Sequence, residues 1–203
     1  MKDVVALMHN PRLDGLQNYF FRRLAALLEP LEPASSDEQI DLSIGQPMHA
    51  TPDLLTETLA DNGHLWRNYP PVKGTSAFRD AARNWLTRRY RLPDGMLSAD
   101  EHVLPVAGTK EALFMLSQLV TPEEKAGAKP AVLMPNPFYN VYLGGALLAG
   151  AEPVLLSVTA ASNHLPDLDQ LSPDLLKRTV AFFLCSPANP QGSAASLDYL
   201  TKA

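Results

Sequence analysis

The chain contains very little cysteine. Its 203 residues include only Cys185, so no internal disulfide can form, and the composition fits a reducing compartment such as the cytoplasm. It lacks a run of about 18 apolar residues, which a membrane-spanning helix would need. A net charge of -5 argues against a broad basic surface for nucleic acid. We therefore expect a cytoplasmic protein that binds neither membranes nor nucleic acid.

Several motifs that mark common catalytic sites are also missing. The five histidines show no metal-ligand spacing with one another or with Cys185, so no metal site is predicted. The sequence has no Gly-x-Gly-x-x-Gly dinucleotide fingerprint and no Gly-x-x-x-x-Gly-Lys-Ser/Thr phosphate loop. It also has no Gly-x-Ser-x-Gly nucleophile elbow. The sequence therefore carries none of these three signatures.

What the sequence does contain is an alternation of apolar strands and helices. We expect strands at 102–106, 131–134, 152–158 and 179–184, and helices at 16–28, 51–59, 75–90, 109–120, 138–149 and 174–177. This alternation predicts an α/β fold with a mostly parallel sheet and helices on both faces. Residues 1–41 do not follow it. We expect them to form an N-terminal arm and small-domain segment, and residues 42–203 to form part of a large domain.

The junction at Gly108, Thr109 and Lys110 joins a predicted strand to a predicted helix. Glycine lets the backbone approach a ligand closely, and the first amides of a helix have no intrahelical acceptor. The helix dipole adds positive character, and Thr109 adds a hydroxyl. The junction is therefore either a phosphate cradle or an ordinary helix start that Thr109 caps.

Two further turns follow predicted strands. Tyr139 and Tyr142 share a helical face after the strand at 131–134, where a ring either lies on a planar ligand or packs in the core. Asn189 lies in the turn at 186–192, where its amide either binds a ligand or only tolerates the turn before a proline. In open α/β sheets, ligands bind at the carboxyl ends of strands.

Two positions outside the strand ends also have two interpretations. Tyr69 lies in a stiff loop with two prolines, where it either packs or reaches into a site. Gly45 is either a plain turn or a place where a substrate approaches the backbone.

Five motifs, taken in their order along the chain, resemble those of the fold-type I pyridoxal-phosphate aminotransferases of class I/II. They are Ile44-Gly45-Gln46-Pro47, Asn68-Tyr69-Pro70 with Gly74 and Phe78-Arg79, Gly108-Thr109-Lys110-Glu111-Ala112-Leu113, Asn136-Pro137-Phe138-Tyr139-Asn140-Val141-Tyr142, and Ser186-Pro187-Ala188-Asn189-Pro190-Gln191-Gly192. Residues 10–17 also resemble the start of succinyldiaminopimelate aminotransferases, which act in lysine and peptidoglycan precursor synthesis. The resemblance implies amino-group transfer between an amino acid and a 2-oxo acid.

The resemblance also implies a role for each candidate in binding pyridoxal 5'-phosphate. Gly108, Thr109 and Lys110 would hold the cofactor phosphate. Tyr139 would stack on the pyridine ring, and Asn189 would bind the phenolic oxygen.

The resemblance also implies that the remaining two candidates lie next to the substrate or reach a second subunit. Gly45 would line the site of the substrate carboxylate. Tyr69 would reach the phosphate of the neighbouring subunit, because family members are homodimers.

The sequence departs from the family pattern in its lysines. The family's Schiff-base lysine lies well downstream of the Asn-Pro turn, and only Lys202 follows Asn189, too close and in the wrong context. Gln191 also stands where the family usually has threonine. We therefore expect an N-terminal portion with no catalytic residue of its own and no activity alone. A fold-type I lyase, an acyl-transferring synthase and a non-catalytic fragment are the alternatives.

Overall fold

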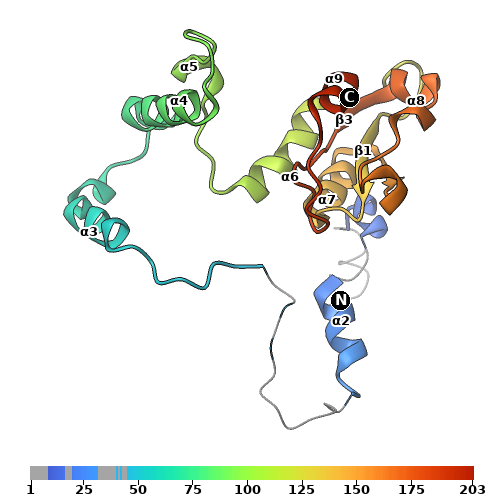
Figure 1. Cartoon of the computed structure of the whole chain (residues 1–203), viewed down its shortest axis with the longest axis horizontal. Helices are drawn as coiled ribbons and strands as arrows, with labels where there is room; N and C mark the ends of the chain where they lie inside the picture. The colour runs from blue at the N-terminus through green and yellow to red at the C-terminus, as the bar shows by residue number, and fades with distance from the viewer. Residues whose placement is uncertain (1–8, 17–19, 32–39, 41, 43–44) are drawn as a thin grey trace. The chain divides into compact units, whose positions relative to one another are not determined.

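The structure is a computed structural model that describes residues 9–16, 20–31, 40, 42 and 45–203. The chain divides into two compact units (Figure 1). One unit combines residues 1–29 with 106–203, and the other is formed by residues 30–105. The domain boundary expected after residue 41 stays a prediction. The sequence also predicts a short extended piece at 42–44, of which residues 43 and 44 lie outside the described part of the chain.

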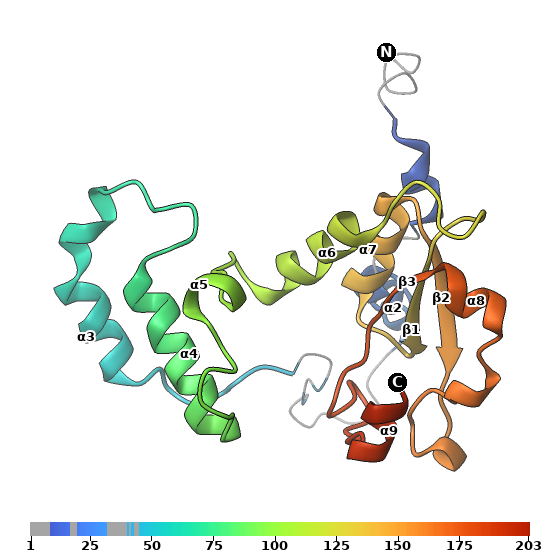
Figure 2. The same cartoon turned by 90° about the horizontal axis from the view of Figure 1, so that it is seen from above.

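The first unit contains a three-stranded parallel sheet (Figure 2). Its strands are β1 (Ala131–Asn136), β2 (Glu152–Ser157) and β3 (Thr179–Phe182), in the order β2-β1-β3. Both pairings of β1 are parallel, which confirms the predicted fold class. After the end of β3, the Phe183 amide still donates to the Leu133 carbonyl at 2.9 Å. The carboxyl ends of the strands therefore lie at one edge of the sheet.

The central strand β1 forms the core of this unit. Val132 and Met134 pack with residues of α7 (Asn140–Ala149) and with Phe183, and Phe114 of α6 (Thr109–Val120) packs against this cluster. Leu133 points to the opposite face, because side chains alternate along a strand, and it is only 2% exposed. Both faces of β1 are thus covered, which explains its unbroken apolar sequence.

The other helices are divided between the two units. The first unit adds η1 (Pro11–Gly15), α2 (Phe20–Leu28), η3 (Ala160–Ser162), η4 (Leu168–Gln170), α8 (Pro173–Arg178) and α9 (Leu197–Lys202). The second unit contains α3 (Asp53–Asp61), η2 (Gly63–Arg67), α4 (Ser76–Tyr90) and α5 (Ala99–His102). The helix expected at 16–28 is seen as α2 from Phe20 onward. Its expected start at Leu16 is wrong, because Leu16 is extended after η1, and residues 17–19 lie outside the described part of the chain.

The strand expected at 102–106 is wrong. Residues 99–102 form α5, and residues 103–106 belong to no strand. Pro105 has no amide hydrogen to donate to a strand ladder, whereas Asp100 and Glu101 favour the positive end of a helix. The sequence also predicts Thr51 as the cap of the helix at 51–59, which is wrong, because α3 begins at Asp53 after Pro52 and has no side-chain cap.

The helices α6 and α7 cross closely at two adjacent glycines. A Cβ at Gly145 would lie 2.9 Å from the Phe114 carbonyl oxygen and 3.0 Å from the Ser117 hydroxyl oxygen. A Cβ at Gly144 would lie 3.7 Å from the Phe114 ring, which is an ordinary contact. The absence of a side chain at Gly145 therefore allows this helix pair to pack.

We predict opposite effects for alanine at the two glycines. Gly145→Ala should lower the free energy of unfolding by about 1–3 kcal/mol, because the backbone of α6 must move. Gly144→Ala is the matched control and should be neutral or stabilising, since alanine favours a helix over glycine by about 1 kcal/mol. Hydrogen exchange of the β1 amides, followed at increasing urea concentration, measures the unfolding of this unit. Equal effects of the two substitutions would contradict the prediction.

Candidate functional site

The start of α6 requires a glycine. Gly108 occupies the N-cap position with φ 136° and ψ 150°, which is a conformation that L side chains rarely adopt. A Cβ there would also lie 2.8 Å from a carboxylate oxygen of Glu111. The expectation that Thr109 caps this helix is wrong, because Thr109 is its first residue and Gly108 precedes it.

This arrangement leaves amide donors at the start of α6. The first backbone bond into the helix comes from the Ala112 amide, which donates to the Gly108 carbonyl at 3.2 Å. The amides of Thr109, Lys110 and Glu111 come earlier and have no intrahelical acceptor. Thr109 and Lys110 are exposed. The junction therefore presents backbone donors, a hydroxyl and an ammonium group, while the Glu111 carboxylate lies beside it.

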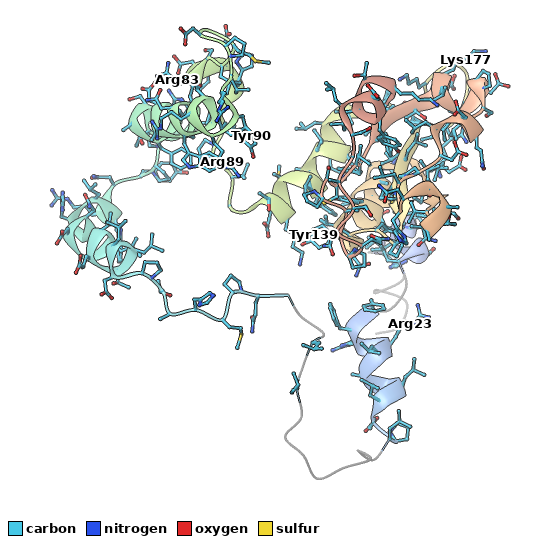
Figure 3. All side chains as sticks on the ribbon, viewed as in Figure 1. Arg23, Arg83, Arg89, Tyr90, Tyr139 and Lys177 are labelled. Carbon is cyan, nitrogen blue, oxygen red and sulfur yellow. The ribbon has the colours of Figure 1, made fainter. Side chains whose placement is uncertain are left out.

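The two tyrosines expected on one helical face have different environments, because Tyr139 is extended before α7 and only Tyr142 lies in the helix. Tyr142 is 8% exposed and belongs to the core. Its ring lies parallel to the Phe183 ring, with centroids 4.3 Å apart and an interplanar angle of 6°. Tyr139, labelled in Figure 3, is the N-cap residue of α7 and is 39% exposed. It meets Tyr142 edge to face, with ring centroids 5.8 Å apart. Of the two rings, Tyr139 is accessible to a ligand.

The stack of Tyr142 on Phe183 brings together the segments that follow β1 and β3. Burial, with smaller contributions from Cys185 and Tyr139, raises the pKa of Tyr142 above its ordinary value. The Cys185 thiol donates to the Pro187 carbonyl at 3.1 Å. An aromatic group from the start of α7 therefore lies against the chain that leads from β3 into the proline-rich turn.

Hydrogen bonds within the turn hold its backbone. The Ala188 amide donates to the Ser193 carbonyl, and the Gly192 amide donates to the Ala188 carbonyl, each at 2.7 Å. The Ser186 hydroxyl oxygen accepts from the Ala195 amide at 3.0 Å. Asn189 is exposed in this turn, and its side chain has no hydrogen-bond partner among the described residues.

The remaining two candidates, Tyr69 and Gly45, belong to the unit of residues 30–105. Tyr69 is 95% exposed in the loop between η2 and α4. A Cβ at Gly45 would meet nothing within 4 Å. The roles expected of both residues stay predictions.

Two negative findings apply to the described part of the chain. It has no group of three or more histidine, cysteine, aspartate or glutamate side chains that could hold a metal ion. None of its helices is both long enough and apolar enough to cross a membrane.

The structure adds one residue whose function the sequence did not reveal. The Arg79 side chain is only 11% exposed. Its guanidinium donates to the Gly74 carbonyl at 2.6 Å and to the Lys73 carbonyl at 3.1 Å, and it pairs with Asp100 at 2.7 Å. Gly74 has φ 70°, and a Cβ there would lie 2.5 Å from Pro105. Arg79 belongs to one of the five sequence motifs, but the motif does not show that the Arg79 side chain stabilises the loop that follows Tyr69.

We predict that Arg79→Ala loosens this loop. Without the guanidinium, the Lys73 and Gly74 carbonyls lose a charged donor, and such hydrogen bonds contribute about 1.5–3 kcal/mol. Amide hydrogen exchange of residues 72–75 should become at least about tenfold faster, since that energy exceeds about 1.4 kcal/mol. Arg88→Ala, an exposed change on the same helix, is the control and should leave the exchange unchanged. Unchanged exchange in Arg79→Ala would contradict the prediction.

Comparison with known proteins identifies the family. Residues 37–203 match aminotransferase class I and II. LL-diaminopimelate aminotransferase of Desulforudis audaxviator (strain MP104C) is 31% identical over 194 residues, which cover 94% of this chain and 47% of that protein. The corresponding enzyme of Moorella thermoacetica (strain ATCC 39073 / JCM 9320) is 32% identical over 190 residues, covering 93% of this chain and 46% of that protein.

Solved structures agree with this result. An aminotransferase from Neisseria meningitidis Z2491 matches with a TM-score of 0.87 and 38% identity, covering 96% of this chain and 48% of that one. The aminotransferase AspB from Helicobacter pylori 26695 matches with a TM-score of 0.79 and 30% identity, covering 91% and 46%.

The chain therefore belongs to the class I and II aminotransferases, a family that depends on pyridoxal 5'-phosphate. It spans about half the length of the curated relatives that it matches. The family and its cofactor are those that the five motifs predict.

Proposed function

We propose that this chain supplies the cofactor-binding part of an enzyme that transfers an amino group between an amino acid and a 2-oxo acid. The observation that carries the proposal is the conformation of Gly108, which opens the start of α6. Backbone amides and positive dipole character at a helix start suit a phosphate group. The names of the relatives favour an aminotransferase over a lyase or an acyl-transferring synthase.

The side chains around the strand ends fit the other parts of pyridoxal 5'-phosphate. The amides of Thr109 and Lys110 and the Thr109 hydroxyl would bind the phosphate, and Lys110 adds charge. The accessible face of Tyr139 would cover the pyridine ring and exclude water from it. The Asn189 amide group would donate to the phenolic oxygen and orient the ring. When bound, the cofactor supplies an electron sink, whereas the protein supplies position and charge.

The proposal extends to the substrate and to the assembly. Gly45 would leave room for the substrate carboxylate, and Tyr69 would reach the cofactor phosphate of the second subunit in a cytoplasmic homodimer. The relatives' names favour LL-diaminopimelate as the amino donor, in lysine biosynthesis. An N-succinyl-diaminopimelate and glutamate pair is the alternative that the residues at 10–17 favour.

We predict that the purified chain does not catalyse amino transfer. Lys202 is the only lysine after Asn189, and its ammonium group pairs with Asp169. The chain therefore offers no lysine in the family's position to bond covalently to the cofactor. A coupled assay with LL-diaminopimelate, 2-oxoglutarate and pyridoxal 5'-phosphate should give the rate of the protein-free control. Turnover above the rate of that control would refute the prediction if the turnover disappears in Lys202→Met.

Binding of the cofactor is tested separately with pyridoxamine 5'-phosphate, which has no aldehyde and so cannot react with surface lysines. We predict that Gly108→Ala raises its Kd at least about tenfold, or about 1.4 kcal/mol, because a Cβ distorts the start of α6. Gly95→Ala is the control, since Gly95 also has a positive φ, of 78°, but lies in the other unit with nothing within 4 Å. It should leave the Kd unchanged.

Two results would contradict this prediction. Wild-type affinity in Gly108→Ala would show that α6 does not hold the ligand. Equally strong binding of pyridoxamine without its phosphate would show that the phosphate is not recognised.

A further inference from the structure

Three aromatic rings form a continuous series at the carboxyl ends of β1 and β3. Phe183 follows β3, and its ring is stacked on Tyr142 with centroids 4.3 Å apart. Tyr142 in turn meets Tyr139 at 5.8 Å with an interplanar angle of 90°. We call Phe183, Tyr142 and Tyr139 the aromatic series. It runs from the core to a ring that solvent reaches.

The middle ring determines the orientation of the outer one. Tyr142 is buried in the core cluster, so packing restricts it to one rotamer. Tyr139 has two side-chain torsions and is only partly buried, and Tyr142 is the one aromatic ring it contacts among the described residues. An edge-to-face contact stabilises one relative orientation of the two rings. Loss of this contact would let Tyr139 populate other rotamers.

We propose that Tyr142 is a positioning residue for a planar, phosphorylated pyridine ligand. Its ring, held against Phe183, keeps the Tyr139 ring in the orientation that stacks on the ligand. This inference rests on the proposed function, because it assumes that Tyr139 covers the cofactor ring. It adds a residue to the site that does not touch the ligand.

The contribution of Tyr142 comes from its ring rather than from its hydroxyl. No hydrogen bond of this hydroxyl is found in the described part of the chain. Burial raises the pKa of Tyr142, so the hydroxyl stays protonated at neutral pH and brings no negative charge near the ligand. Tyr142→Phe should therefore keep the positioning role, whereas Tyr142→Leu, which stays apolar but has no aromatic ring, should weaken it.

The first measurement needs no ligand. In the chain labelled with 3-fluorotyrosine, the fluorine resonance of Tyr139 is assigned by its loss in Tyr139→Phe. We expect Tyr142→Leu to move this resonance toward the shift of free fluorotyrosine, because the ring current of Tyr142 is removed. Tyr142→Phe should leave it near the wild-type position. An unmoved Tyr139 resonance in Tyr142→Leu would overturn the proposal.

The second measurement is the Kd of pyridoxamine 5'-phosphate. We expect about a fivefold to tenfold rise in Tyr142→Leu, corresponding to about 1–1.4 kcal/mol, and less than a twofold change in Tyr142→Phe. Tyr139→Leu should have at least as large an effect. The double variant should bind like Tyr139→Leu alone, because Tyr142 acts through Tyr139. Additive losses, or equal losses in Tyr142→Leu and Tyr142→Phe, would overturn the proposal.

Further controls separate the possible failures. If Tyr142→Leu does not fold, as judged by hydrogen exchange of β1, Phe183→Leu replaces it, because it removes the stack without touching Tyr139. An unmoved Tyr139 resonance in that variant would then overturn the proposal. If the wild-type chain binds no pyridoxamine 5'-phosphate, the proposed function fails, and the fluorine spectra alone decide whether Tyr142 fixes Tyr139. Wild-type affinity in a variant whose Tyr139 resonance has moved refutes the positioning role and leaves the proposed function intact.

Discussion

The parallel pairing of β1 with both of its neighbours is the constraint on which the rest of the first unit depends. It puts the carboxyl ends of the strands at one edge of the sheet, so that the segments after β1 and β3 leave from the same place. The stack of Tyr142 on Phe183 then joins those two segments. The crossing of α6 over α7 at Gly145 anchors the helix whose first residues are the phosphate-binding candidates. A change in strand order would separate all of these groups.

The sequence predicted the elements in which local pattern and burial agree. The four apolar residues at 131–134 form a strand because both faces of the sheet are covered, and Gly150 ends α7 in the left-handed conformation. The strand predicted at 102–106 does not form. Pro105 has no amide hydrogen to donate, and the apolar pattern does not show which strand these residues would pair with. Backbone pairing is a property of the fold, and a five-residue pattern does not contain it.

At the site, too, the sequence shows which residue types are present but does not show the environment of each side chain. Its candidates could be named from their places after strands, yet Tyr139 and Tyr142 have identical side chains three residues apart. Only packing makes one of them core and the other accessible. Arg79 could not be interpreted from its helix alone, because its acceptors are the carbonyls of Lys73 and Gly74 and the carboxylate of Asp100 in α5. Such contacts link separate segments of the chain, and the spacing of residues in the sequence does not predict them.

The proposed binding groups share one kind of chemistry. The Thr109 hydroxyl, the Lys110 ammonium and the Asn189 amide are donors, which suit the phosphate and the phenolic oxygen of the ligand. Proton transfer needs a group whose pKa lies near the working pH. The pKa of Tyr142 is shifted the other way, by burial, and Lys202 is paired with Asp169. The donors among the described residues at the strand ends of the first unit therefore suit the proposed role, which is to hold and orient a flat anion.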